Sequence, residues 1–217
     1  MKILNVNKYY YLKGGAEKVY FDTAKLLEEH GHEVIPFSMK DKKNFPSIYE
    51  DYFIENVDFF NKENKFVKKI RNIGHLFYSM EAKFMVEKIV KATSPDIVHL
   101  HNIYHQMSPS FLSVLKKKYK LPIVMTAHDY KLICPNYSLL AHGKICEKCH
   151  KHKYYNAFLT SCHKDSFISS SILALEQSFH KVFKFYEKNI DLLICPSDFI
   201  KNKFQDWGLK MKMEVVP

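Results

Sequence analysis

Short apolar runs alternate with amphipathic stretches along this chain of 217 residues. The apolar runs predict strands at residues 2–7, 33–37, 96–101, 121–126, 191–195 and from 214 onward. Stretches with apolar residues every three or four positions predict helices from Gly15 to about 30, from about 62 to 88, and at 108–119, 168–188 and 197–204. This alternation is typical of an α/β fold with a parallel sheet. Residues 46–64 show no clear period, and we make no prediction for them.

The composition narrows the class of protein. A chain of this length with 47% hydrophobic residues can bury a full core, so we expect one compact domain. No apolar run is long enough to cross a bilayer, and the first one is too short for a signal peptide, which predicts a cytoplasmic location. Five cysteines, an odd number, argue against a disulfide framework. The net charge of +10 favours anionic partners, namely nucleic acid, acidic lipid or phosphorylated small molecules.

Polar clusters follow three of the predicted strands. They are Lys13-Gly14-Gly15-Ala16-Glu17-Lys18, His99-Leu100-His101-Asn102 and Thr126-Ala127-His128-Asp129-Tyr130. Ligands of open α/β sheets bind outside the carboxyl ends of the strands, so the three clusters predict one shared binding site.

The pair Gly14-Gly15 lies between a predicted strand and a predicted helix. Residues without Cβ let an anionic ligand approach the backbone, and a helix N-terminus offers free N–H groups to a phosphate. The spacing matches neither the dinucleotide fingerprint nor the Walker loop. The alternative is a tight turn that only lets the helix dock on the sheet.

Histidines stand at two of the strand ends. His99 and His101 alternate along a strand, so we expect them to face opposite sides of the sheet, with one of them structural. His128 lies at a strand terminus next to Asp129 and Tyr130, a group suited to hydrogen bonding a polyhydroxylated ligand. The alternative for each histidine is a ring satisfied by a neighbouring carbonyl.

Four cysteines fall in residues 132–165, a Cys/His-rich insertion. A Cys-x2-Cys pair with one further cysteine on each side supplies the four thiolates of a tetrahedral structural zinc site: Cys134, Cys146, Cys149 and Cys162. His150, His152 and His163 are substitutes if one cysteine is not a ligand. The alternative is that the thiols are reduced and unligated. Cys195, inside an apolar run, is predicted to pack in the core.

The basic amphipathic stretch 62–88 has two interpretations. Its apolar stripe packs on the sheet with the lysines in solvent, or it rests on an anionic membrane surface without crossing the bilayer.

Taken in order, these motifs resemble a known family. Gly14-Gly15-Ala16-Glu17-Lys18, residues 95–101, residues 124–129, Cys195-Pro196-Ser197 and the terminal Val215-Val216-Pro217 look like the N-terminal half of family 4 glycosyltransferases of the GT-B fold. The resemblance implies two Rossmann-like domains facing a cleft. Residues 1–217 are then the acceptor-side domain, a Rossmann-like open parallel sheet with helices on both faces that carries the Cys-rich insertion. The C-terminal donor-binding domain is expected to be absent, so the chain alone should be inactive.

Carried over to this sequence, the resemblance assigns candidate roles. Gly14 and Gly15 approach the donor diphosphate, and His128 is the catalytic position beside the transferred sugar. His101, Asn102 and Tyr130 are candidates for acceptor contacts. The implied reaction transfers a sugar from a nucleotide-sugar, with retention of anomeric configuration, to a glycan or lipid-linked acceptor in surface polysaccharide or glycoconjugate synthesis.

The implied location is the cytoplasm, with peripheral contact at the inner face of the cell membrane. Two alternatives come from other classes: a non-catalytic carbohydrate-binding module and a zinc-stabilised nucleic-acid-binding module. The basic residues are scattered and no RRM, KH or helix-turn-helix pattern occurs, so we expect no nucleic-acid partner.

Overall fold

A six-stranded parallel sheet forms the centre of the protein. The computed structural model describes residues 1–56 and 73–217. The strands run in the order β2-β1-β3-β4-β7-β8, and every neighbouring pair is parallel. Their bounds are β1 Lys2–Val6, β2 Glu33–Phe37, β3 Ile97–Leu100, β4 Ile123–Thr126, β7 Leu192–Cys195 and β8 Met213–Val215. The predicted Rossmann-like open sheet is therefore confirmed.

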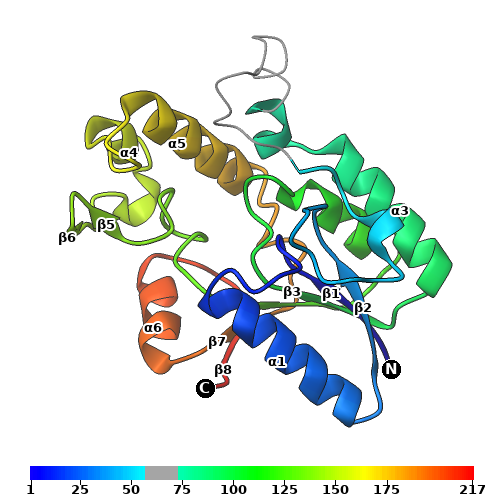
Figure 1. Cartoon of the computed structure of the whole chain (residues 1–217). Coiled ribbons are helices and arrows are strands. Elements are labelled where there is room, and N and C mark those ends of the chain that lie inside the picture. The colour runs from blue at the N-terminus through cyan, green and yellow to red at the C-terminus, as the bar shows by residue number, and fades with distance from the viewer. Residues whose placement is uncertain (57–72) are drawn as a thin grey trace.

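Helices cover the sheet on both faces. Residues 3–6 of β1 are all buried, although successive side chains point to opposite faces, so both faces must be covered. In Figure 1, α1 (Gly15–Glu29) and α3 (Met80–Thr93) lie on opposite sides of the sheet. Further along the described chain lie α4 (Asn156–Leu159), α5 (Phe167–Val182) and α6 (Asp198–Asp206).

Local signals in the sequence set several helix ends. Gly31 adopts φ +78° directly after α1, a left-handed conformation that favours glycine. The Ser197 hydroxyl accepts a hydrogen bond from the Ile200 amide and caps α6, as predicted. Ser79 caps α3 in the same way, with its hydroxyl accepting from the Ala82 amide.

The predicted helix at 62–88 is wrong as one continuous element. Residues 62–72 lie in the part that the structure does not describe. Residues 73–77 are helical, the helix stops at Tyr78, and α3 begins anew at Met80. Ser79 interrupts the helix because its amide donates to the Ser110 hydroxyl at 3.1 Å while its own hydroxyl caps α3. The apolar period runs through this break, so periodicity could not reveal it.

Two other predicted helices are also altered. Residues 108–119 form a 3₁₀ turn at Pro109–Phe111 and a π-helical turn at Val114–Lys118 rather than one α-helix. The helix predicted to reach 188 ends at Val182, and a series of turns follows. A further 3₁₀ turn, Glu50–Tyr52, lies in the stretch for which we made no prediction.

The segment between β4 and α5 contains small elements outside the main sheet. β5 (Leu140–Ala141) and β6 (Lys144–Ile145) form an antiparallel hairpin, followed by a 3₁₀ turn at His150–His152 and by α4. Glu147 forms an ion pair with Lys203 of α6 at 2.8 Å, and the rings of His150 and Trp207 are 5.2 Å apart. These contacts attach the segment to α6.

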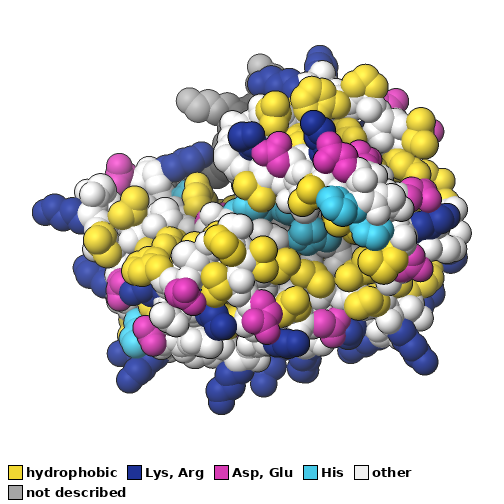
Figure 2. Space-filling view, turned by 90° about the horizontal axis from the view of Figure 1, so that it is seen from below, with side chains coloured by type: hydrophobic (Ala, Val, Ile, Leu, Met, Phe, Trp, Pro, Cys, Tyr) yellow, Lys and Arg dark blue, Asp and Glu magenta, His cyan; other side chains and the backbone are white. Residues whose placement is uncertain are grey.

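Two surface properties bear on partners. Within the described residues, the helices are all too short or too polar to cross a membrane. Figure 2 shows Lys and Arg side chains projecting around the edge of one face, whereas hydrophobic side chains gather near its middle. On this face the basic residues form no continuous stripe of the kind that follows a nucleic-acid backbone.

Candidate active site

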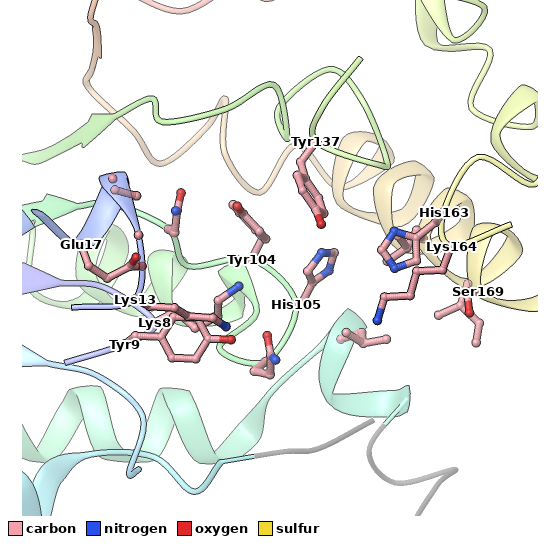
Figure 3. Close-up of a pocket in the computed structure, with 18 of the residues that line it drawn as sticks. Lys8, Tyr9, Lys13, Glu17, Tyr104, His105, Tyr137, His163, Lys164 and Ser169 are labelled. Carbon is pink, nitrogen blue, oxygen red and sulfur yellow. The ribbon is translucent and has the colours of Figure 1, made fainter. Parts of the chain in front are cut away.

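A cavity of about 700 Å³ opens at the carboxyl ends of β1 and β3. Within the sheet, β2 pairs with one edge of β1 and β3 pairs with its other edge. The strand order therefore reverses at β1, which makes this position a topological switch point. The loop from β1 to α1 and the loop after β3 form two walls, and residues from 73 to 76, Tyr137 and residues 163–173 complete the lining. Figure 3 shows the arrangement.

Gly14 and Gly15 line this cavity at the start of α1. Gly14 has φ −164°, which is extended backbone that any residue adopts, and Gly15 is the first residue of the helix. A Cβ added to Gly15 would meet nothing within 4 Å, and one added to Gly14 would meet only the Glu17 carboxylate at 3.6 Å. The fold itself therefore does not require glycine at either position. What the two glycines provide is open space in front of a helix N-terminus.

Cationic side chains gather beside the glycines. Lys8 follows β1 and is 9% exposed, and its Nζ lies 4.5 Å from the centre of the Tyr104 ring. The Nζ of Lys13 lies 3.8 Å from the centre of the Tyr9 ring. Burial and the neighbouring charge of Lys13 lower the pKa of Lys8 to about 8. Binding of an anion would relieve both effects, because it would pair with the lysine and raise its pKa again.

The other end of the cavity differs in character. His163, Lys164 and Ser169 stand there in Figure 3, with His105 and Tyr137 between them and the Lys8 end. Apolar side chains fill in the lining around these polar groups: Ile73, Leu76, Ile172 and Leu173. The cavity thus combines an anion-attracting end with a partly apolar end.

A buried polar network supports the floor of the cavity. Glu176 of α5 is fully buried and accepts hydrogen bonds from Lys131 Nζ at 2.8 Å and from His105 Nδ1 at 3.0 Å. Burial by itself raises the pKa of Glu176, but His105 and Lys131 lower it below its usual range. Tyr104 donates a short hydrogen bond to Asp129, whose other oxygen accepts from the Lys131 amide at 2.8 Å. Asp129 therefore positions its neighbours and does not extend into the cavity.

Three histidines form a second cluster at the ends of β3 and β4. His101 Nδ1 and His128 Nε2 are 2.8 Å apart, and His99 Nε2 lies 2.8 Å from the Thr126 hydroxyl. The rings of His99 and His101 are only 4.3 Å apart, so the prediction that they face opposite sides is wrong. Side chains alternate between the faces of a strand at every residue, so positions 99 and 101, two residues apart, share one face. Burial lowers the pKa of His99 and of His128 to about 4, which keeps both rings neutral near pH 7.

The structure brings together some of the predicted site residues and separates others. Gly14, Gly15 and Asn102 line the cavity, and Asn102 is tied to β1 because its carbonyl accepts from the Lys8 amide at 2.9 Å. His101 and His128 contact each other but are absent from the cavity lining. Tyr130 packs against the Phe204 ring at 6.4 Å and does not line the cavity either.

Sequence reasoning missed most of the polar lining. Tyr104 and His105 come only two and three residues after Asn102, a proximity that could have indicated them. Lys8 directly follows the first strand and Lys13 directly precedes the glycines. No sequence signal indicated Tyr137 or His163, because the turns of the insertion bring them to the cavity.

The four cysteines between β4 and α5 lie near one another without forming a metal site. Cys149 is buried, and burial together with the nearby thiols of Cys134, Cys162 and Cys146 raises its pKa to about 12. Across residues 1–56 and 73–217, no group of three or more His, Cys, Asp or Glu side chains is arranged to hold a metal ion. The geometry therefore gives no support to the predicted zinc.

Comparison with known proteins identifies the family. Residues 13–217 match Glycosyltransferase Family 4. The chain belongs to this family. An uncharacterized 42.6 kDa protein of the cps region in Klebsiella pneumoniae is 29% identical to this family 4 chain over 221 residues. The match covers 96% of this chain and 52% of that protein, so the chain spans about half the length of its relative.

Two solved structures also align with this family 4 member. A UDP-N-acetylglucosamine 2-epimerase aligns at TM-score 0.48 with 14% identity, over 99% of this chain and 47% of that one. MurG of Acinetobacter baumannii aligns at TM-score 0.35 with 14% identity, over 89% and 70% of the two chains.

Proposed function

We propose that this chain is the acceptor-binding half of a retaining glycosyltransferase. In this proposal a sugar passes from a nucleotide-sugar to a glycan or lipid-linked acceptor, and a second, donor-binding half faces the cavity. Membership of glycosyltransferase family 4 supports the reaction class. The length of the Klebsiella pneumoniae relative, of which this chain spans about half, supports the presence of a second half in the complete enzyme. That relative's place in a cps region supports a role in surface polysaccharide or glycoconjugate synthesis.

One observation carries the proposal: the open approach at Gly14-Gly15. The backbone accepts side chains at both positions, so the fold does not require glycine there, and we assign the open space to a ligand. The N-terminus of the 15-residue helix α1, the ammonium groups of Lys8 and Lys13 and the carboxylate of Glu17 surround this space. The helix N-terminus and the two lysines outweigh the single carboxylate, which favours a phosphate. The diphosphate of a nucleotide-sugar would place its transferred sugar toward the remaining part of the cavity.

The neutral histidine pair His101 and His128 has a place in this proposal. We assign His128 to the side of the transferred sugar, where a neutral ring can donate one hydrogen bond to a sugar hydroxyl. For His128 to donate from Nδ1, its Nε2 must accept from the Nδ1–H of His101, 2.8 Å away, and this contact also fixes the orientation of the ring. Asn102, in the cavity wall, is assigned to the acceptor.

Two further parts of the proposal concern location and metal. We propose a cytoplasmic enzyme that contacts the inner face of the membrane, and the exposed apolar side chains Met80 and Phe84 on α3 support that contact. We also retain a structural metal bound by the insertion cysteines as a proposal to be tested by metal analysis. The ground for it is the number of thiols, four in residues 132–165, and not their arrangement.

The test compares Gly15→Leu with Val19→Leu, which places the same side chain further along α1. The complete gene product is incubated with a panel of radiolabelled nucleotide-sugars and a membrane extract as acceptor. We expect Gly15→Leu to fold with a free energy of unfolding within about 1 kcal/mol of the parent and to lose transfer at least about tenfold, whereas Val19→Leu keeps its activity. Equal activity of the two variants would remove the support from the glycines. Absence of transfer with every donor would refute the proposed function.

A further inference from the structure

His105 lies in the middle of the cavity wall, and its ring contacts the buried carboxylate of Glu176. In Figure 3 its ring lies between the Lys8 end and the His163 end of the cavity. Its Nδ1 lies 3.0 Å and 3.1 Å from the two oxygens of Glu176, and the His105 side chain is 14% exposed while Glu176 is fully buried. Glu176 also accepts from Lys131, which is itself 2% exposed.

The partners of Glu176 decide the protonation of the ring. Lys131 supplies the positive charge that keeps Glu176 ionised, and an ionised carboxylate can only accept hydrogen bonds. Nδ1 of His105 must therefore carry its proton. Burial lowers the pKa of His105 to about 4, so the ring holds one proton and not two near pH 7. Nε2 is consequently the unprotonated nitrogen and a hydrogen-bond acceptor.

Nε2 of His105 is available to accept a hydrogen bond from a ligand in the cavity. The ring edge packs against Tyr104 at 5.0 Å and Tyr137 at 6.4 Å, and in the part of the chain that the structure describes Nε2 has no hydrogen-bond partner. The backbone of His105 adopts φ +63°, a conformation that costs a non-glycine residue about 1 kcal/mol or more. The fold thus holds Nε2 of His105 as a fixed hydrogen-bond acceptor at the cavity wall. The lysines that line the two ends of the cavity can only donate hydrogen bonds.

We propose that His105 Nε2 accepts a hydrogen bond from a hydroxyl group of the acceptor saccharide, with Glu176 and Lys131 as positioning residues that fix the tautomer. This inference rests on the proposed function, because it names the chemistry by which the acceptor half recognises its substrate. The ligand class is a polyhydroxylated saccharide that presents one hydroxyl to the ring and reaches the cationic end with an anionic group. Deoxygenation at that one hydroxyl should weaken binding more than deoxygenation elsewhere.

The first test needs no transferase activity. Long-range proton–nitrogen NMR of the 217-residue chain at pH 7 should show His105 with a protonated Nδ1 and an unprotonated Nε2, with the resonances assigned by their loss in His105→Asn. Methyl glycosides of hexoses and N-acetylhexosamines, added up to their solubility limit, should shift the Nε2 resonance. A protonated Nε2, or no shift with any member of the panel, overturns the proposal.

The second test uses the complete gene product. His105→Asn suits it, because Asn tolerates a positive φ and its amide can still donate to Glu176, but it lacks a ring nitrogen that reaches the cavity. The expected result is a rise of about three- to tenfold in the acceptor KM, the loss of one neutral hydrogen bond, with the donor KM within twofold. The control is His30→Asn on the surface.

The outcomes separate this inference from the proposed function. An acceptor KM that changes no more than in the control refutes the role of His105 while leaving the transferase intact. Absence of transfer combined with a saccharide-induced shift of Nε2 refutes the transferase and leaves His105 as part of a carbohydrate site.

Discussion

Removal of Lys131 tests the buried network most directly. At an effective dielectric constant of about 20, unit charges 2.8 Å apart attract one another by about 6 kcal/mol. The cost of removing both charges from water offsets much of this attraction, so the intact pair contributes little net stability. Lys131→Met, however, leaves the Glu176 carboxylate buried with only the neutral His105 as a hydrogen-bond donor. We expect a loss of about 3–5 kcal/mol in the free energy of unfolding.

The assay is urea unfolding at pH 7, with Lys116→Met as the matched control. Lys116 forms an ion pair of similar length with Asp191, 2.6 Å, but its side chain is 31% exposed, so the control should lose about 1 kcal/mol or less. The double variant Lys131→Met/Glu176→Gln should recover most of the loss, because no charge is then left buried. If Lys131→Met destabilises the protein no more than Lys116→Met, Glu176 is not a dry, ionised carboxylate. The reasoning on the His105 tautomer would then fail as well.

Three further predictions concern stability in acid, metal content and membrane contact. Acid should destabilise the protein, because four histidines have a pKa of about 4 in the folded chain against about 6.5 in the unfolded chain: His99, His105, His128 and His180. The unfolded chain therefore binds more protons, so the free energy of unfolding is highest above pH 6.5 and decreases as the pH falls. Urea unfolding should show a loss of about 2 kcal/mol or more between pH 7 and pH 5, and an unchanged free energy of unfolding would contradict this prediction. If the thiols hold a metal, elemental analysis of protein purified under reducing conditions should find about one zinc per chain, lost in Cys149→Ser; zinc near background in the parent ends that proposal. The parent chain should sediment with vesicles of acidic lipid, and a smaller fraction of the Phe84→Asp variant should do so. Equal sedimentation of the two proteins would exclude α3 as the membrane contact.

The sheet could be predicted from sequence because its strands are short apolar runs separated by clear polar boundaries. Residues 33–37 were predicted to the residue, since polar positions flank the run on both sides. The break at Ser79 could not be predicted, because its cause is a hydrogen bond with Ser110, 31 positions away in the sequence. The same holds for the turns at 108–119, where the path of the chain depends on packing against α3 and not on local period.

The site was partly predictable for a similar reason. Clusters that directly follow strands meet at one edge of a parallel sheet, and Gly14, Gly15 and Asn102 line the cavity there, whereas their roles in binding stay predictions. The prediction that His99 and His101 face opposite sides failed because residues two positions apart on a strand point to the same face. Glu176, the group that organises the floor of the cavity, carries no signal in the sequence: it is the one acidic residue of an amphipathic helix, and only the tertiary structure reveals its burial.

The junction at residues 77–79 has a consequence for evolution of the cavity. The carbonyl oxygen of Phe77 accepts hydrogen bonds from both His180 and Ser108, and the Ser79 backbone exchanges two hydrogen bonds with the Ser110 hydroxyl. The chain is thus fastened at a single point just after the stretch that contributes Ile73 and Leu76. Substitutions before this point can reshape one wall of the cavity while α3 and the sheet stay in place. One wall of the cavity can therefore vary independently of the scaffold that supports it.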